Sequence, residues 1–389
     1  MLMAIATGLA AASPAAAGTA RARAPAHRVV GSGTPGSCTS ARVVAAVRAG
    51  GIIHFACGPR PVTIAMRRTA KVVNTSPRVV LDGAGKVTLS GEHRRRILYM
   101  DTCDRRQVWT TSHCEQQPSP RLVVSGLTFE DGVSRHDGST GGGAIYAFGG
   151  QLRIAHSTFL DNRCAPASGS GVGGGAVSAL WQDRAWPAQI TDSRFRANVC
   201  DNRGAGGGGG AVFSTQERLR IAGSTFTANR CAKVGSDVGG AAVRAFVDDG
   251  GPVKVTGSRF AHNVCSNGAA LSSIGVSWSV RHSRFEDNRA IGVGANPARA
   301  GTPGGGSGGA IYNDGDRMTL SIADSTFRGN RAREGGGAIF FVSDDRTGTM
   351  RISHSTLVDN PNAGFHTAGL PGIFFLGAHR PAITHSVLR

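Results

Sequence analysis

One short motif recurs through most of the chain and limits the folds that the chain can adopt. A serine is followed two residues later by an aromatic residue and, after three more, by an asparagine. The asparagines are Asn162, Asn198, Asn229, Asn263, Asn288, Asn330 and Asn360, spaced 36, 31, 34, 25, 42 and 30 residues apart. A constant motif with a variable period places the insertions in loops, which is typical of a solenoid.

Each repeat also holds three apolar stretches of strand length, such as "AIYAF", "QLRIA" and "STFL" within residues 144–160. Three short strands per repeat are what one coil of a parallel β-helix needs, with coils stacked about 4.8 Å apart. The 57 glycines and the 17% of charged residues favour turns over long helices. We therefore expect an all-β parallel β-helix.

This fold stacks equivalent residues of successive coils into columns. The aromatic column is Phe159, Phe195, Phe226, Phe260, Phe285 and Phe327, ending in Leu357. The aliphatic column is Ile154, Ile190, Ile221, Val255, Val280, Ile322 and Ile352. We expect both columns in the core, and the asparagines in a ladder of side-chain amides at a tight turn. Glycan or metal binding by these asparagines is the alternative.

Four cysteines lie two residues after the ladder asparagines of four consecutive coils. The coil spacing of about 4.8 Å lies within the Cα separation that a disulfide allows. The sequence therefore predicts the bridges Cys164–Cys200 and Cys231–Cys265. A zinc site would need thiols that converge on one point, whereas a column spreads them along a line.

The other four cysteines lie nearer the N-terminus. Cys38 and Cys57 flank an expected capping helix at 40–51, with Ser40 as its N-cap, and a disulfide between them is expected to tether this cap. Cys103 and Cys114 are expected to close a loop. An even number of cysteines is consistent with an oxidising compartment.

The chain divides into three expected parts. Residues 1–20 are apolar and end in small residues, which predicts a secretory signal peptide, and 21–37 are expected to be a disordered linker. The β-helix with its cap occupies 38–389. Earlier coils are expected at 77–91 and 121–132, with Phe129 in the aromatic column and Gly132 in place of the asparagine.

The "GGGAI", "STF" and "N" elements resemble the repeats of polymorphic outer-membrane proteins, within the right-handed parallel β-helix proteins of the pectin-lyase-like superfamily. The resemblance covers about residues 38–389 and implies a right-handed β-helix. It leaves the function open, because this scaffold occurs in lyases, hydrolases, adhesins and surface proteins.

A uronate lyase of this superfamily would hold Ca²⁺ with clustered acids and use Arg or Lys as the base. The expected outward column of the first strand is Tyr146, Ser178, Phe213, Arg244, Ser272, Tyr312 and Phe340, which contains no acid. Its one cation, Arg244, is the candidate base. The paired carboxylates of a polygalacturonase are not visible.

Acids gather between the first and second strands, where Asp248, Asp249, Asp314 and Asp316 are candidate Ca²⁺ ligands. The alternative is that Asp and Gly simply form turns there. The sequence requires no cofactor, and calcium is the one cofactor that these acids suggest.

Cations gather on the outward faces of the second and third strands, in a chain of formal net charge +18. The candidate binding residues are Arg153, Arg220, Lys254 and Arg351 in one column, and Arg194, Arg259 and Arg284 in another. Such a track suits an extended acidic polymer, although surface charges also serve solubility.

These features predict a secreted, disulfide-containing β-helix that engages acidic polysaccharide of the cell envelope or surroundings. A uronate lyase and a surface structural protein or adhesin are the alternatives. We expect a monomer without nucleic acid as partner, and no membrane span beyond the signal peptide.

Overall fold

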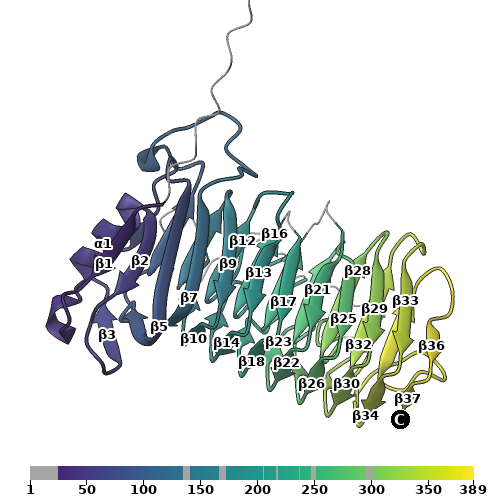
Figure 1. Cartoon of the computed structure of the whole chain (residues 1–389). Coiled ribbons are helices and arrows are strands. Elements are labelled where there is room, and N and C mark those ends of the chain that lie inside the picture. The colour runs from purple at the N-terminus through teal and green to yellow at the C-terminus, as the bar shows by residue number, and fades with distance from the viewer. Residues whose placement is uncertain are drawn as a thin grey trace, which may run out of the picture.

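A computed structural model describes residues 25–134, 141–165, 172–204, 206–215, 218–235, 237–246, 251–294, 300–301 and 304–389. The expected signal peptide, 1–20, lies outside these residues. The strands stand side by side in one long row that starts beside helix α1 (Ser40–Ala49) and ends at β36 and β37 (Figure 1). All paired strands among the described residues run parallel, and the fold is the expected all-β parallel β-helix.

The first strand of each coil belongs to a ten-stranded sheet within the described residues. Its strands are β4 (Ala70–Lys71), β6 (Leu98–Asp101), β8 (Ile145–Phe148), β12 (Val177–Leu180), β16 (Val212–Thr215), β20 (Val243–Phe246), β24 (Leu271–Ile274), β28 (Ile311–Gly315), β32 (Ile339–Ser343) and β35 (Ile373–Leu376).

The second and third strands share a 21-stranded sheet, because β5 and β7 run through both positions without a break. Its strands are β1 (His27–Val30), β2 (Gly51–Phe55), β3 (Val62–Ala65), β5 (Arg78–Ser90), β7 (Arg121–Glu130), β9 (Gln151–Ala155), β10 (Thr158–Leu160), β13 (Ala188–Thr191), β14 (Arg194–Arg196), β17 (Leu219–Ala222), β18 (Thr225–Thr227), β21 (Val253–Thr256), β22 (Arg259–Ala261), β25 (Trp278–Arg281), β26 (Arg284–Glu286), β29 (Thr319–Ala323), β30 (Thr326–Arg328), β33 (Thr349–Ser353), β34 (Thr356–Val358), β36 (Ala382–Thr384) and β37 (Val387–Leu388).

A six-stranded sheet of two-residue strands follows the ladder asparagines. Its strands are β11 (Arg163–Cys164), β15 (Val199–Cys200), β19 (Arg230–Cys231), β23 (Val264–Cys265), β27 (Arg289–Ala290) and β31 (Arg331–Ala332). Two short 3₁₀ turns, η1 (Pro35–Ser37) and η2 (Arg105–Gln107), complete the described elements.

The aromatic column is a continuous stack in the core. From Phe129 to Phe327, successive ring centroids lie between 4.4 and 5.1 Å apart, with interplanar angles between 2° and 8°. The rings are buried, as is the aliphatic column from Ile154 to Ile352. Because each coil adds one ring, the stack links every repeat to its neighbours through dispersion and apolar burial.

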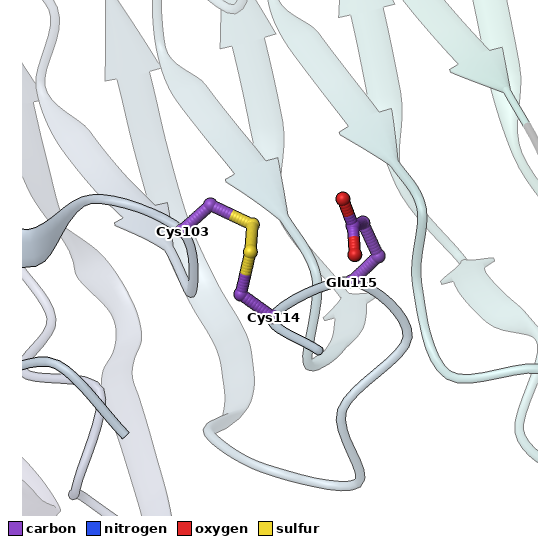
Figure 2. A group of neighbouring side chains, drawn as sticks. All are labelled: Cys103, Cys114 and Glu115. Atoms are coloured by element: carbon purple, nitrogen blue, oxygen red, sulfur yellow. A yellow bond between two sulfur atoms is a disulfide. The ribbon is translucent and has the colours of Figure 1, made fainter. Parts of the chain in front are cut away.

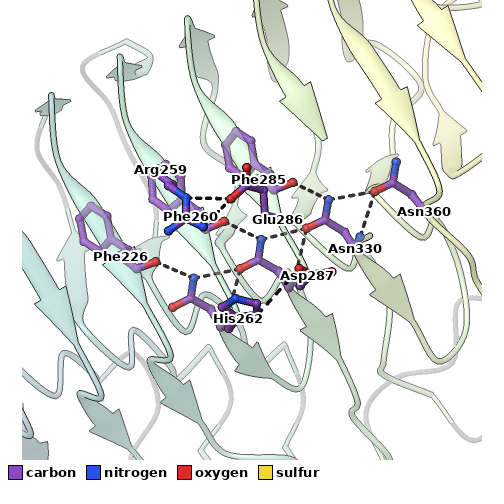
Figure 3. Close-up of polar contacts among 11 residues, drawn as sticks. Phe226, Arg259, Phe260, His262, Phe285, Glu286, Asp287, Asn330 and Asn360 are labelled. Carbon is purple, nitrogen blue, oxygen red and sulfur yellow. Dashed lines mark hydrogen bonds and ion pairs between the residues drawn. The ribbon is translucent and has the colours of Figure 1, made fainter. Parts of the chain in front are cut away.

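The asparagine ladder is also present (Figure 3). Each Nδ2 from Asn162 to Asn330 donates to the Oδ1 of the next asparagine at 2.8–3.0 Å. It also donates to a phenylalanine carbonyl of the preceding coil at 2.9–3.1 Å. The side-chain amides form hydrogen bonds with one another and with backbone groups, which confirms the predicted structural role of these asparagines.

The serines form a second ladder whose role the sequence did not reveal. Each serine N–H, from Ser157 to Ser355, donates to the Oγ of the next serine at 3.0–3.2 Å. Each Oγ in turn donates to the carbonyl two residues earlier at 2.7–2.9 Å. Serine thereby satisfies the backbone at the bend between the second and third strands.

The N-terminal end differs from expectation in two details. Strand β1 lies inside 21–37, the expected linker, because "HRVV" pairs in parallel with β2 and forms the first rung. Helix α1 is capped by Thr39 and not by Ser40, since the Thr39 side chain accepts from the N–H of Arg42. Val43 and Val47 are fully buried, so the helix covers the open end of the first coils as expected.

Four disulfides join the predicted partners. They are Cys38–Cys57, Cys103–Cys114, Cys164–Cys200 and Cys231–Cys265. The latter two link stacked coils, with Cα atoms 4.8 and 4.7 Å apart. These distances are the rung spacing of a β-helix, and this is why equivalent cysteines of neighbouring coils can be bridged.

Candidate functional site

The outward face of the 21-stranded sheet carries the predicted cations in register. Strand pairing places Arg153 beside Gln189, Gln189 beside Arg220, and Arg220 beside Lys254. The same position then reads Ser279, Ser321 and Arg351 in the next three coils. The four cations are exposed, and we call Arg153, Arg220, Lys254 and Arg351 the cation column.

The third-strand cations form a second column on the same sheet. The pairing order is Thr158, Arg194, Thr225, Arg259, Arg284 and Thr326. Arg259 is neutralised, because its Nη2 lies 2.6 Å and its Nε 2.7 Å from Oε2 of Glu286 on the next coil (Figure 3). This column is therefore partly compensated by one acid of its own sheet, Glu286.

The cation column is not compensated in this way. Within the described parts of the chain, no carboxylate forms an ion pair with Arg220 or Lys254, although the two stand on adjacent rungs. Like charges placed directly opposite each other on neighbouring strands are unfavourable by roughly 0.2–1 kcal/mol. A bound anion would relieve this repulsion.

The first-strand column does not face solvent, which corrects the prediction for Arg244. Arg244 is 0% exposed, and its Nη1 donates to Oγ of Ser272 at 2.6 Å. Burial lowers the pKa of Arg244 to about 10. A buried guanidinium cannot contact a polymer substrate, so Arg244 is not a candidate base in this structure.

Glycine-rich segments cover this column. Gly173, Gly208, Gly239 and Asn267 form bridges from coil to coil above the first-strand side chains. A Cβ at Gly173 would overlap the Gly208 carbonyl oxygen and the Phe213 ring, and one at Gly239 would overlap Ser272 Oγ. Only glycine allows the backbone to approach so closely. The sequence interpretation treated these glycines as turn residues and missed this layer.

Two of the four candidate calcium ligands, Asp314 and Asp316, belong to the described residues. Asp248 and Asp249 lie outside the described residues. Asp314 Oδ2 accepts the Tyr312 hydroxyl at 2.9 Å and Oδ1 accepts the Gly315 N–H at 3.0 Å. Asp316 is exposed and contacts Ser343 only through its backbone carbonyl. Ca²⁺ needs six to eight oxygen ligands, which this pair does not supply.

Burial raises the pKa of Asp314, and the charges of Asp344 and Asp237 raise it further, against the opposing hydrogen bond from Tyr312. A raised carboxyl pKa means that the native state binds the proton more tightly than the unfolded chain. Above the native pKa, the ionised Asp314 carboxylate therefore lowers the stability of the folded protein. This destabilisation disappears as the pH falls through the native pKa and the carboxyl group takes up its proton.

Asp314→Asn is accordingly expected to raise Tm at pH 7 and to lose this advantage in acid, below the ordinary carboxyl range. Asp316→Asn makes the same charge change on an exposed side chain and is the control. Thermal unfolding of the three proteins between pH 3 and pH 8 measures the effect. A constant Tm difference across this range would contradict the assignment.

One group among the described residues has metal-compatible spacing, formed by Cys103, Cys114 and Glu115 (Figure 2). The two sulfurs are joined in a disulfide and offer no thiolate. Glu115 alone provides a charged ligand, so the group does not fit a bound metal ion.

The sequence interpretation missed a further row of arginines on the six-stranded sheet. The residue after each of the first six ladder asparagines reads Arg163, Val199, Arg230, Val264, Arg289 and Arg331 in register. We call its four arginines the edge column. A cavity of about 720 Å³ lies along it, lined by Arg163 and Arg230 among others. The recurring "N-R-C" and "N-R-A" triplets in the sequence could have revealed this row of arginines.

The geometry defines a disulfide-bridged parallel β-helix with cations in rows. The chain matches the Chlamydia polymorphic membrane protein repeat over residues 324–342. This segment includes Ser325 of the serine ladder, Phe327 of the aromatic column and Asn330 of the asparagine ladder. The protein is thus a parallel β-helix with repeats similar to those of the polymorphic membrane proteins.

No curated protein matches the chain. The crystal structure of bacteriophage CBA120 tailspike protein 3 is similar with a TM-score of 0.37 and 13% identity, over 92% of this chain and 59% of the tailspike chain. The chain thus spans less than two thirds of that protein. No helix among the described residues is long and apolar enough to cross a membrane.

Proposed function

We propose that this protein is secreted and binds an extended acidic polysaccharide along the cation column of the 21-stranded sheet. The observation that carries the proposal is the adjacent, exposed pair Arg220 and Lys254, which forms no ion pair with any carboxylate of the described residues. Four disulfides support an extracellular location, because such bonds persist in oxidising compartments.

The column suits a polymer better than a small anion. Its positions repeat at the rung spacing of about 4.8 Å, so an extended chain running along the solenoid axis meets cations at several rungs. The net charge of +18 also raises the rate of encounter with any polyanion. Guanidinium groups bind carboxylates or sulfates through paired hydrogen bonds, which suits uronate or sulfated sugars.

The 21-stranded sheet is favoured over the edge column because it carries more cations. Arg194 and Arg284 project from the same sheet as the cation column, one strand further along each coil. Binding rather than cleavage is proposed because Arg244, the one candidate base, is buried.

A matched pair of double variants tests the site. Arg220→Gln with Lys254→Gln removes two adjacent cations from the cation column, and Arg289→Gln with Arg331→Gln removes two adjacent cations from the edge column. The first double variant is expected to raise the Kd for polygalacturonate about five- to tenfold, whereas the second changes it little. Surface-immobilised polygalacturonate and a series of salt concentrations provide the measurement.

An equal loss of affinity for polygalacturonate in the two double variants would show that only the net charge of the protein matters, and would contradict the proposed site. Retention that does not weaken with salt would contradict an electrostatic mode of binding.

A further inference from the structure

A small pocket lies at the N-terminal end of the cation column. Its volume is about 160 Å³, and Arg153, the first member of the column, contributes to its wall. The other lining residues are Arg78, Arg121, Leu122, Val123, Gln151 and Trp186. Strand pairing explains the cluster, since Arg78, Arg121 and Gln151 are neighbours on β5, β7 and β9.

Trp186 is held over this pocket by a turn that Asp183 stabilises. Oδ1 of Asp183 accepts the Ala185 N–H at 3.0 Å, and its carbonyl accepts the Trp186 N–H at 3.1 Å. Oδ2 of Asp183 accepts from Nε2 of Gln151 at 2.9 Å, which ties the turn to β9. The backbone that carries the indole is thus fixed before any ligand arrives, and 48% of the Trp186 surface is exposed.

Three arginines of the pocket wall carry the charge beside the indole. The Arg153 guanidinium lies 5.8 Å from the Trp186 ring centroid, within the range of a cation–π contact. No ion pair to Arg78, Arg121 or Arg153 is found within the described residues. Three cations therefore line the same pocket as one exposed indole, and Gln151 is the neutral polar residue beside them.

We propose that this pocket is a subsite for a single hexuronate unit of the acidic polysaccharide. The apolar C–H face of the pyranose ring packs on the indole, and the carboxylate accepts hydrogen bonds from the arginines. The volume is below the roughly 300–1,000 Å³ typical of drug-sized ligands, so the pocket holds one ring and not a whole oligosaccharide. This inference rests on the proposed function and adds the sugar class and the position at which the polymer is fixed.

Trp109 provides a matched control on the same molecule. It is 41% exposed, and the Arg105 guanidinium lies 4.5 Å from its ring centroid, so it also combines an exposed indole with an arginine. It lies on the excursion after β6 and does not line this pocket. Any effect of losing an exposed indole in general would appear equally in Trp109→Ala.

The test is titration of the full chain with trigalacturonate, followed by tryptophan fluorescence and calorimetry. Wild-type protein is expected to bind with a change in fluorescence, and Trp186→Ala is expected to raise Kd about tenfold or more. Trp109→Ala leaves Kd unchanged, and Trp186→Phe retains part of the affinity. Arg121→Gln raises Kd severalfold, whereas Arg42→Gln, on the exposed side of α1, does not. The methyl ester of trigalacturonate, which lacks the charge, binds more weakly than the acid.

Two results would overturn the subsite: no binding of trigalacturonate to the wild-type protein, or equal affinities for Trp186→Ala and Trp109→Ala. If polygalacturonate retention still depends on Arg220 and Lys254 in that case, the proposed function stands while the subsite falls. If trigalacturonate binds through Trp186 but the polymer is not retained by the column, the subsite stands and the cation column falls.

Discussion

Phe226→Ala is expected to lower the free energy of unfolding by about 4 kcal/mol, near the middle of the range for buried aromatic truncations. The ring is fully buried and stacks on Phe195 and Phe260, with centroids 4.7 and 5.0 Å away. Its removal leaves a cavity between two rings that the rungs hold at fixed separation, so the stack cannot close the gap. Urea unfolding followed by circular dichroism measures the loss.

Phe226→Leu is the matched variant, because it keeps most of the apolar volume and is expected to cost less than half as much. A loss below about 1 kcal/mol for Phe226→Ala would contradict a close-packed stack at this position.

Asn229→Ala is expected to be about as destabilising, at roughly 4 kcal/mol, for a different reason. The substitution removes the acceptor of the Asn198 N–H and of Asn198 Nδ2, and the donor to the Phe195 carbonyl. Asn198 is fully buried, so water cannot replace these bonds. Each unsatisfied buried polar group costs about 1–3 kcal/mol.

Arg230→Ala, at the next residue, removes an exposed side chain from the same turn and is the control. It is expected to change stability by less than about 0.5 kcal/mol. Equal unfolding midpoints for Asn229→Ala and Arg230→Ala would show that the ladder contributes nothing to stability.

The sequence predicted those parts of the fold that repeat with the rung. Phe226, Asn229 and Cys231 recur at fixed offsets in the coils, and a column of identical residues can be satisfied only when coils stack in register. Once the coil spacing is known, the reach of a disulfide pairs Cys231 with Cys265. The register of the cation column followed for the same reason.

The features that the sequence did not predict depend on segments between the columns. Arg244 occupies an outward strand position, but a glycine-rich backbone segment covers it. The alternation of inward and outward residues along a strand cannot predict that another segment covers the outward face. Trp186 lies in a loop whose conformation depends on Asp183 contacting both its own turn and Gln151 of β9. Strand β1 was missed because four residues flanked by a basic, proline-containing segment carry little periodicity.

The most direct test of polymer binding by the cation column is the dependence of affinity on ligand length. From Arg153 to Arg351 the register spans six rungs, about 29 Å at the rung spacing of about 4.8 Å. Calorimetric titration with oligogalacturonates of increasing length is expected to show affinity rising stepwise until the ligand spans this distance, and then levelling off. Affinity that does not change with length, or the absence of binding at every length, would contradict the account.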